Sequence, residues 1–233
     1  MVDSAKICLT ESRAKKNSSA EIEISWLLTE AVIDQVTANE NAAAIHYDSA
    51  FSIISSEQPA FRITQKAYLQ AFHFYRYYSL CGTGVNRSAE FVELCQNANN
   101  DSLLMLGLLQ EMEMRECEGD TSKNKEIKSR IEQLLVKHPS FLGAYFDRLG
   151  VSESFFERWP QAIKYYLEAE NRYLGRNDEE AISQLYMSMA DVYDQLNDHR
   201  KAKKYLLRIK EFRYSKQDHL IDDYYNTLGW SPG

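Results

Sequence analysis

A chain of 233 residues, 44% hydrophobic and 26% charged, has the balance of a globular protein and can bury one large core or two small ones. Its 34 acidic and 27 basic residues give a net charge of −7, which argues against nucleic-acid binding because a grip on phosphates needs a basic face. Nowhere do about 18 apolar residues run together, so we expect no membrane span.

The chain predicts helices almost throughout. Residues 1–19 are polar, lack an apolar stretch long enough for a signal peptide, and are expected to form a flexible leader. Beyond them, apolar residues recur at three- and four-residue spacing without strand-like alternation, and only 9 glycines and 4 prolines interrupt the pattern. The sequence therefore predicts an all-α fold.

The first third of the chain predicts a three-helix bundle over residues 20–80. Its helices are expected at 20–36, 41–55 and 59–80, and the short polar joints between them require neighbouring helices to run antiparallel. The stretch "CGTGVNRS" at 81–88 contains two glycines among polar residues and is predicted to be a linker.

The third predicted helix carries an unusual number of aromatic residues. They are Tyr68, Phe72, Phe74, Tyr75, Tyr77 and Tyr78. Core packing explains most of them, but they exceed what one helix face can bury in a small bundle. The surplus could form an exposed contact patch.

Residues 89–233 predict a short, right-handed array of tetratricopeptide-like helix pairs. Gly150 and Ala162 are followed 40 residues later by Ala190 and Ala202, and small residues at this spacing let two antiparallel helices cross closely. The pattern begins a third time at Leu228. A final helix at 217–229 could cap the array, or a second copy of the chain could cover it as a homodimer.

The four cysteines are Cys8, Cys81, Cys95 and Cys117. They lie far apart and form no CxxC pair, so neither a zinc site nor a disulfide framework is indicated. A reducing cytoplasm is the expected compartment. The five histidines are not paired at metal-ligand spacing, and no phosphate loop, Ser-His-Asp order or HExxH motif occurs.

This order of elements resembles the Rap family of bacterial response-regulator phosphatases and inhibitors. The similarity is strongest in "AIKYYLEAE" with the later "EAI...MADVY" helix. Fainter matches are Trp26, "IISSEQ" at 53–58 and "FYRYYSL" at 74–80. The resemblance implies a bundle that binds the receiver domain of a response regulator.

The resemblance also implies candidate site residues. Gln58, preceded by Glu57, matches the glutamine that orients a water for attack on the aspartyl phosphate, and Gln65 is the alternative because the spacing from Gln58 to Arg76 is long. The alternative without a functional role is that Gln58 is a loop residue before Pro59. The candidate partner contacts are Glu57, Tyr68, Phe72, Tyr75 and Arg76.

No cofactor of its own is implied, because the receiver domain would supply both Mg²⁺ and phosphate. Inhibition by steric blocking is equally compatible with the resemblance, and a short signalling peptide is a further possible ligand. The competing hypothesis is a noncatalytic tetratricopeptide adaptor that binds a peptide or a partner helix in its concave groove.

Overall fold

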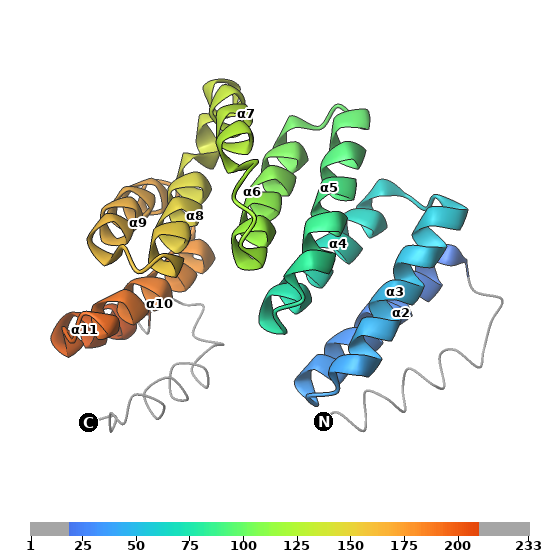
Figure 1. The fold of residues 1–233 in the computed structure, drawn as a ribbon, viewed down its shortest axis with the longest axis horizontal. Helices are drawn as coiled ribbons and strands as arrows, with labels where there is room; N and C mark the ends of the chain where they lie inside the picture. The colour runs from blue at the N-terminus through green and yellow to red at the C-terminus, as the bar shows by residue number, and fades with distance from the viewer. Residues whose placement is uncertain (1–18, 210–233) are drawn as a thin grey trace. The chain divides into compact units, whose positions relative to one another are not determined.

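The structure is a computed structural model that describes residues 19–209. Every regular element in this range is helical, which confirms the all-α fold (Figure 1). The predicted leader up to residue 18, the final helix at 217–229 and the third pattern start at Leu228 lie outside the described residues.

Two compact units make up the chain, Met1–Ser129 and Arg130–Gly233. The first contains α2 (Ala20–Val36), α3 (Glu40–Glu57), α4 (Phe61–Tyr77), α5 (Cys81–Asn97) and α6 (Asp101–Glu118). Helix α7 (Asn124–Lys137) contains the boundary. The second contains the short 3-10 helix η1 (Pro139–Phe141), α8 (Leu142–Phe155), α9 (Trp159–Leu174), α10 (Glu179–Gln195) and α11 (His199–Ile209).

Four of the joints between helices use the same local chemistry. One residue adopts a left-handed backbone, and the next uses its side-chain oxygen to accept a hydrogen bond from the first turn of the following helix. These pairs are Ala38–Asn39, Asn99–Asn100, Asn177–Asp178 and Asn197–Asp198. Such a joint reverses the chain within a few residues, so consecutive helices pack antiparallel.

The stretch 81–88, predicted to be a linker, instead forms the first two turns of α5. Gly84 is buried there, and a Cβ atom at this position would lie 2.4 Å from Met114 Sδ on α6 and 3.4 Å from Tyr75 Cβ on α4. This glycine thus permits close helix packing and does not provide a flexible joint. Sequence composition alone could not distinguish these two uses.

Cys81 and Cys117 form a disulfide, contrary to the prediction from their sequence spacing. Cys81 begins α5 and Cys117 lies one residue before the end of α6, so the antiparallel α5–α6 pair brings the two together. Their Cα atoms are 5.6 Å apart, within the usual range for a disulfide.

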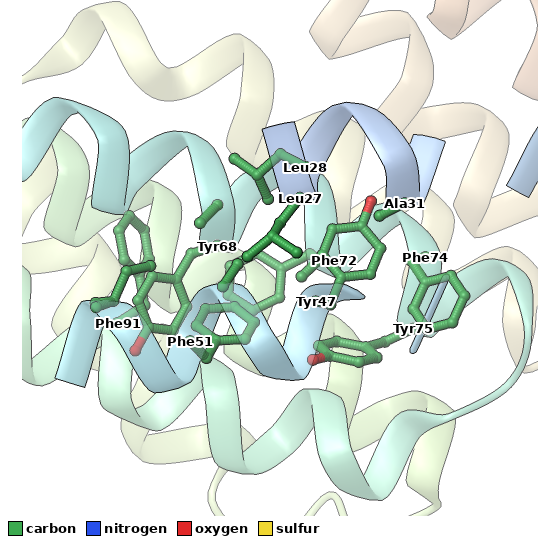
Figure 2. Packing of buried hydrophobic residues seen from close by; sticks show 14 of the residues in the cluster. Leu27, Leu28, Ala31, Tyr47, Phe51, Tyr68, Phe72, Phe74, Tyr75 and Phe91 are labelled. Atoms are coloured by element: carbon green, nitrogen blue, oxygen red, sulfur yellow. The ribbon is translucent and has the colours of Figure 1, made fainter. Parts of the chain in front are cut away.

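Aromatic rings lie together with aliphatic side chains in the core of the first unit, as Figure 2 shows. Tyr68 on α4 lies 4.7 Å from Phe51 on α3 and 5.1 Å from Phe91 on α5, measured between ring centroids. Tyr47 and Phe74 form a second contact at 5.1 Å. Aromatic pairs at these separations add to the free energy of burial, so α3, α4 and α5 are joined through one cluster.

The second unit has the close helix crossings that its repeated pattern predicts. Gly150 on α8 faces Tyr166 on α9 so closely that a Cβ atom would lie 2.4 Å from the ring. Ala162, Ala190 and Ala202 are fully buried, and all three belong to one core cluster. The pairs α8–α9 and α10–α11 are therefore close-packed antiparallel hairpins.

Candidate functional site

A groove lies between α2 and α4 in the first unit. Its volume is about 880 Å³. It is lined by Glu21, Ile22, Ser25, Trp26, Ala60, Arg62, Ile63, Gln65, Lys66, Leu69, Gln70 and His73. The groove combines apolar, cationic and amide side chains on two adjacent helices, a composition that suits a protein partner.

Helical spacing explains how α4 contributes its side of the groove. Arg62, Lys66, Leu69 and His73 follow one another at three- or four-residue intervals and so lie along one helix face. Glu21 fixes the entry of this helix, because its carboxylate accepts a hydrogen bond of 3.2 Å from the Ala60 backbone N–H. The α4 face is thus anchored to α2 at the start of the groove.

The apolar part of the groove comes from both helices. Helix α2 contributes Ile22 and Trp26, and α4 contributes Ile63 and Leu69. Ile22 is 41% exposed, a large fraction for a branched apolar side chain beside other apolar groups. An apolar strip next to exposed Arg62 and Lys66 is the arrangement found in interfaces with an apolar centre and a polar margin.

The two candidate glutamines lie in different pockets. Gln65 is half-buried in the α2–α4 groove, whereas Gln58 is exposed in a second pocket of about 560 Å³ beside α5. Gln58 terminates α3 in a left-handed conformation with φ 46° and ψ 57°. Gln58 and Gln65 therefore do not belong to one site and remain alternatives to each other.

The pocket around Gln58 is acidic. Glu90 and Glu93 line it, and the Glu90 carboxylate accepts a 3.0 Å hydrogen bond from the Tyr68 hydroxyl. Burial raises the pKa of Tyr68, and the neighbouring Glu90 raises it further. Arg87 donates to the same carboxylate at 3.0 Å, so its charge is already engaged. A phosphate placed beside Gln58 would therefore face carboxylates.

The predicted contact residues Tyr68, Phe72 and Tyr75 lie in the core rather than on a binding surface. Their exposed fractions are 4%, 2% and 3%, because α3 and α5 cover the faces of α4 that carry them. Burial raises the pKa of the Tyr75 hydroxyl to about 12. Helical periodicity could not show this, since it does not tell how many helices surround α4.

The other two predicted contact residues are exposed, but neither belongs to the lining of the α2–α4 groove. Glu57 is the last residue of α3, and Arg76 donates a 3.0 Å hydrogen bond to Glu113 on α6. Tyr77 is one of the six aromatic residues among which a surplus is expected on the surface, and it is 78% exposed.

Sequence reasoning missed the cationic part of the groove. Arg62 and Lys66 are one helical turn apart, and their common face with Leu69 was readable from the spacing. No individual motif marks them, because exposed basic residues are common on helices. Their significance comes only from α2, which places Trp26 opposite that face.

Two further kinds of site receive no support within residues 19–209. In that range no cluster of three or more His, Cys, Asp or Glu side chains has the arrangement of a metal site. None of the helices described is both long and apolar enough to cross a membrane.

Solved structures resemble this chain in fold at low sequence identity. A signal-transduction ATPase of the STAND class with a tetratricopeptide repeat sensor, from Pyrococcus horikoshii, matches 91% of the chain with a TM-score of 0.61 and 15% identity. The present chain spans about a third of that protein, 33% of its length.

Two further structures match along most of both chains. The apo form of RapI has a TM-score of 0.60 at 10% identity, covering 90% of each chain. BtubC from P. vanneervenii has a TM-score of 0.59 at 13% identity, covering 100% of this chain and 92% of the other.

No family model matches the sequence, and no curated protein matches it either. The structural likenesses nevertheless place the chain in an all-α, tetratricopeptide-like helical repeat fold, as in RapI. Fold alone does not specify activity, so function has to be argued from the site.

Proposed function

We propose that the chain is a protein-interaction module of a signalling system and that the α2–α4 groove is its partner-binding surface. The observation that carries the proposal is the combination of Trp26 and its apolar neighbours with Arg62 and Lys66 in one groove. Tryptophan and arginine are enriched among the residues that dominate binding energy at protein interfaces. The fold shared with a repeat sensor and with RapI supports protein binding in general.

The proposed partner is the receiver domain of a response regulator. An aspartyl phosphate and its surrounding carboxylates form an acidic patch, and Arg62 and Lys66 would complement that patch electrostatically. The apolar strip of Ile22 and Trp26 would bury part of the partner beside it. The partner would also supply the Mg²⁺ ion, so this chain needs no cofactor of its own.

Gln65 is the better of the two glutamine candidates for phosphoryl hydrolysis. Its amide can donate to and accept from one water, orienting it for in-line attack on phosphorus. Lys66 and Arg62 lie in the same groove and can stabilise the charge on the phosphoryl oxygens. Gln58 has the same amide chemistry, but Glu90 and Glu93 line its pocket. Charge therefore favours Gln65.

Phosphate release from a panel of phosphorylated receiver domains of the host tests the proposal. Gln65→Ala is expected to lower the release rate by about 100-fold while leaving binding intact. Gln58→Ala is the matched control and should retain the rate of the unsubstituted protein. The opposite result would transfer the role to Gln58.

Lys66→Glu tests the groove itself. A carboxylate at this position would face the acidic partner, and we expect binding to weaken at least ~10-fold. Binding without hydrolysis by the unsubstituted protein would identify a steric inhibitor at the same groove. If no receiver domain binds, the response-regulator proposal fails and the adaptor hypothesis, with a peptide or partner helix as ligand, takes its place.

A further inference from the structure

The pairing of Cys81 with Cys117 joins two positions that differ in accessibility. Cys81 is 3% exposed at the first residue of α5, whereas Cys117 is partly exposed near the end of α6. The two cysteines are 36 residues apart in sequence. Cys117 is therefore the more accessible of the two residues to a dissolved reagent.

The hairpin that carries the two cysteines is also held by packing that needs no covalent bond. Near the bridge, Gly84 brings α5 against Met114. Farther along, a Cβ atom on Gly107 would lie 3.2 Å from Val92 and 3.3 Å from Phe91. Because both contacts hold α5 to α6 closely, the hairpin keeps the two thiols near each other when the bridge is open.

Access rather than charge distinguishes the two sulfurs. Cys81 begins α5, but the Glu118 carboxylate lies beside Gly82 at the same helix end and opposes the stabilisation of a thiolate there. Cys95, the remaining cysteine of the described range, is fully buried, and burial raises its pKa to about 11. It is therefore a poor competitor.

We propose that Cys81 and Cys117 form a reversible redox bridge in which Cys117 reacts first and Cys81 closes the bond. The oxidant is a low-molecular-weight disulfide such as oxidised glutathione. This proposal is independent of the partner-binding groove and of the function proposed for it.

The exchange balances in two steps. The Cys117 thiolate attacks the small disulfide, its S–S bond breaks, and one small thiolate leaves. The Cys81 thiolate then attacks the Cys117 sulfur of the mixed disulfide and releases the second small thiolate. The two protein thiols lose two electrons and two protons in total, and the small disulfide takes up both and becomes two thiols. Reduction runs the same steps in reverse.

Equilibration of the full chain in glutathione buffers of graded oxidised-to-reduced ratio tests whether the bridge is reversible. After acid quenching, alkylation and peptide mapping, we expect a single Cys81–Cys117 bridge that opens and closes within the series, with Cys95 alkylated throughout. Absence of the bridge at every ratio would overturn the proposal. So would a bridge that glutathione cannot open in the native protein.

Single substitutions test the order of reaction. Cys81→Ser should accumulate a stable glutathione adduct on Cys117, whereas Cys117→Ser should form an adduct on Cys81 at least ~10-fold more slowly. Cys95→Ser is the matched control and should leave the bridge and its rate unchanged. Faster modification of Cys81 than of Cys117 would contradict the assigned order.

Thermal unfolding of the unsubstituted protein provides a readout that does not depend on variants. Closing a loop of 36 residues is expected to raise the unfolding midpoint of the oxidised form by about 10 °C over the reduced form. Equal midpoints for the two forms would show that the bridge does not constrain the chain.

Discussion

In both units a glycine lets two helices pack closely, but only in the second unit does the sequence pattern predict this close packing. Gly150 faces Tyr166 across the α8–α9 pair, and Gly84 faces Met114 across the α5–α6 pair. In the second unit small residues recur after 40 positions, and the recurrence indicates the close packing. In the first unit Gly84 lies among polar neighbours and no copy of its pattern follows, so the sequence predicts a linker there. A single close crossing has no sequence signature until a copy of it exists.

Both units combine buried aromatic rings with buried polar groups. The first unit relies on rings from α3, α4 and α5, such as Phe51, Phe72 and Phe91 (Figure 2). The second includes a buried polar network, in which Glu170 accepts hydrogen bonds of 2.7 Å from Tyr186 and 2.6 Å from Arg208.

The largest effect is expected from Phe72→Ala in the aromatic core. Phe72 is 2% exposed, and its ring lies 6.0 Å from that of Phe91, so truncation removes buried surface and leaves a cavity. We expect a loss of about 3–5 kcal/mol in the free energy of unfolding, measured in urea. Tyr77→Ala, at a side chain 78% exposed, is the control and should change it by less than about 0.5 kcal/mol. Weaker partner binding at unchanged stability would restore Phe72 as a contact residue.

A pair of glycine substitutions sharpens the comparison between the two crossings. Gly150→Ala places a methyl group against the rigid ring of Tyr166, and overpacking should outweigh the gain in helix propensity by about 1–2 kcal/mol. Gly84→Ala meets Met114, whose Sδ and Cγ would lie 2.4 Å and 2.9 Å from the new Cβ, and because this side chain is flexible the loss should be smaller, about 0.5–1 kcal/mol. Urea denaturation of both variants decides. Equal losses would mean that the two neighbours yield equally well.

The smallest effect is expected at the end of α3. Gln58 has a left-handed backbone, which glycine adopts without a Cβ penalty, so Gln58→Gly should stabilise the protein by about 0.5 kcal/mol. Gln58→Ala retains the penalty and should leave stability unchanged. Chemical denaturation measures both variants. A destabilised glycine variant would indicate that the Gln58 side chain makes a contact worth more than the backbone strain.

Much of the fold was predictable because periodicity reports local structure directly. The three predicted helices at 20–36, 41–55 and 59–80 correspond closely to α2, α3 and α4. Turn chemistry was readable too, since the "NN" and "ND" joints cap the helices that follow. These features depend on residues within a turn or two of one another.

The candidate site was less predictable because it depends on which helices become neighbours. Nothing in the sequence places Trp26 opposite Lys66, or Cys81 beside Cys117. Both juxtapositions follow from antiparallel packing between segments tens of residues apart. The difference in charge between the surroundings of Gln58 and Gln65 has the same origin. Glu93 lies on α5, and the sequence predicts a linker where the first two turns of that helix lie.

The Glu170 network has a consequence for how the second unit loses its structure. The Glu170 carboxylate lies on α9, while the groups that donate to it lie on α10 and α11. These hydrogen bonds therefore connect the α8–α9 hairpin to the α10–α11 hairpin. Separating the hairpins would leave a charged oxygen without its donors in a buried setting, which is costly. Strong coupling of this kind favours melting as one cooperative block over stepwise fraying from an end.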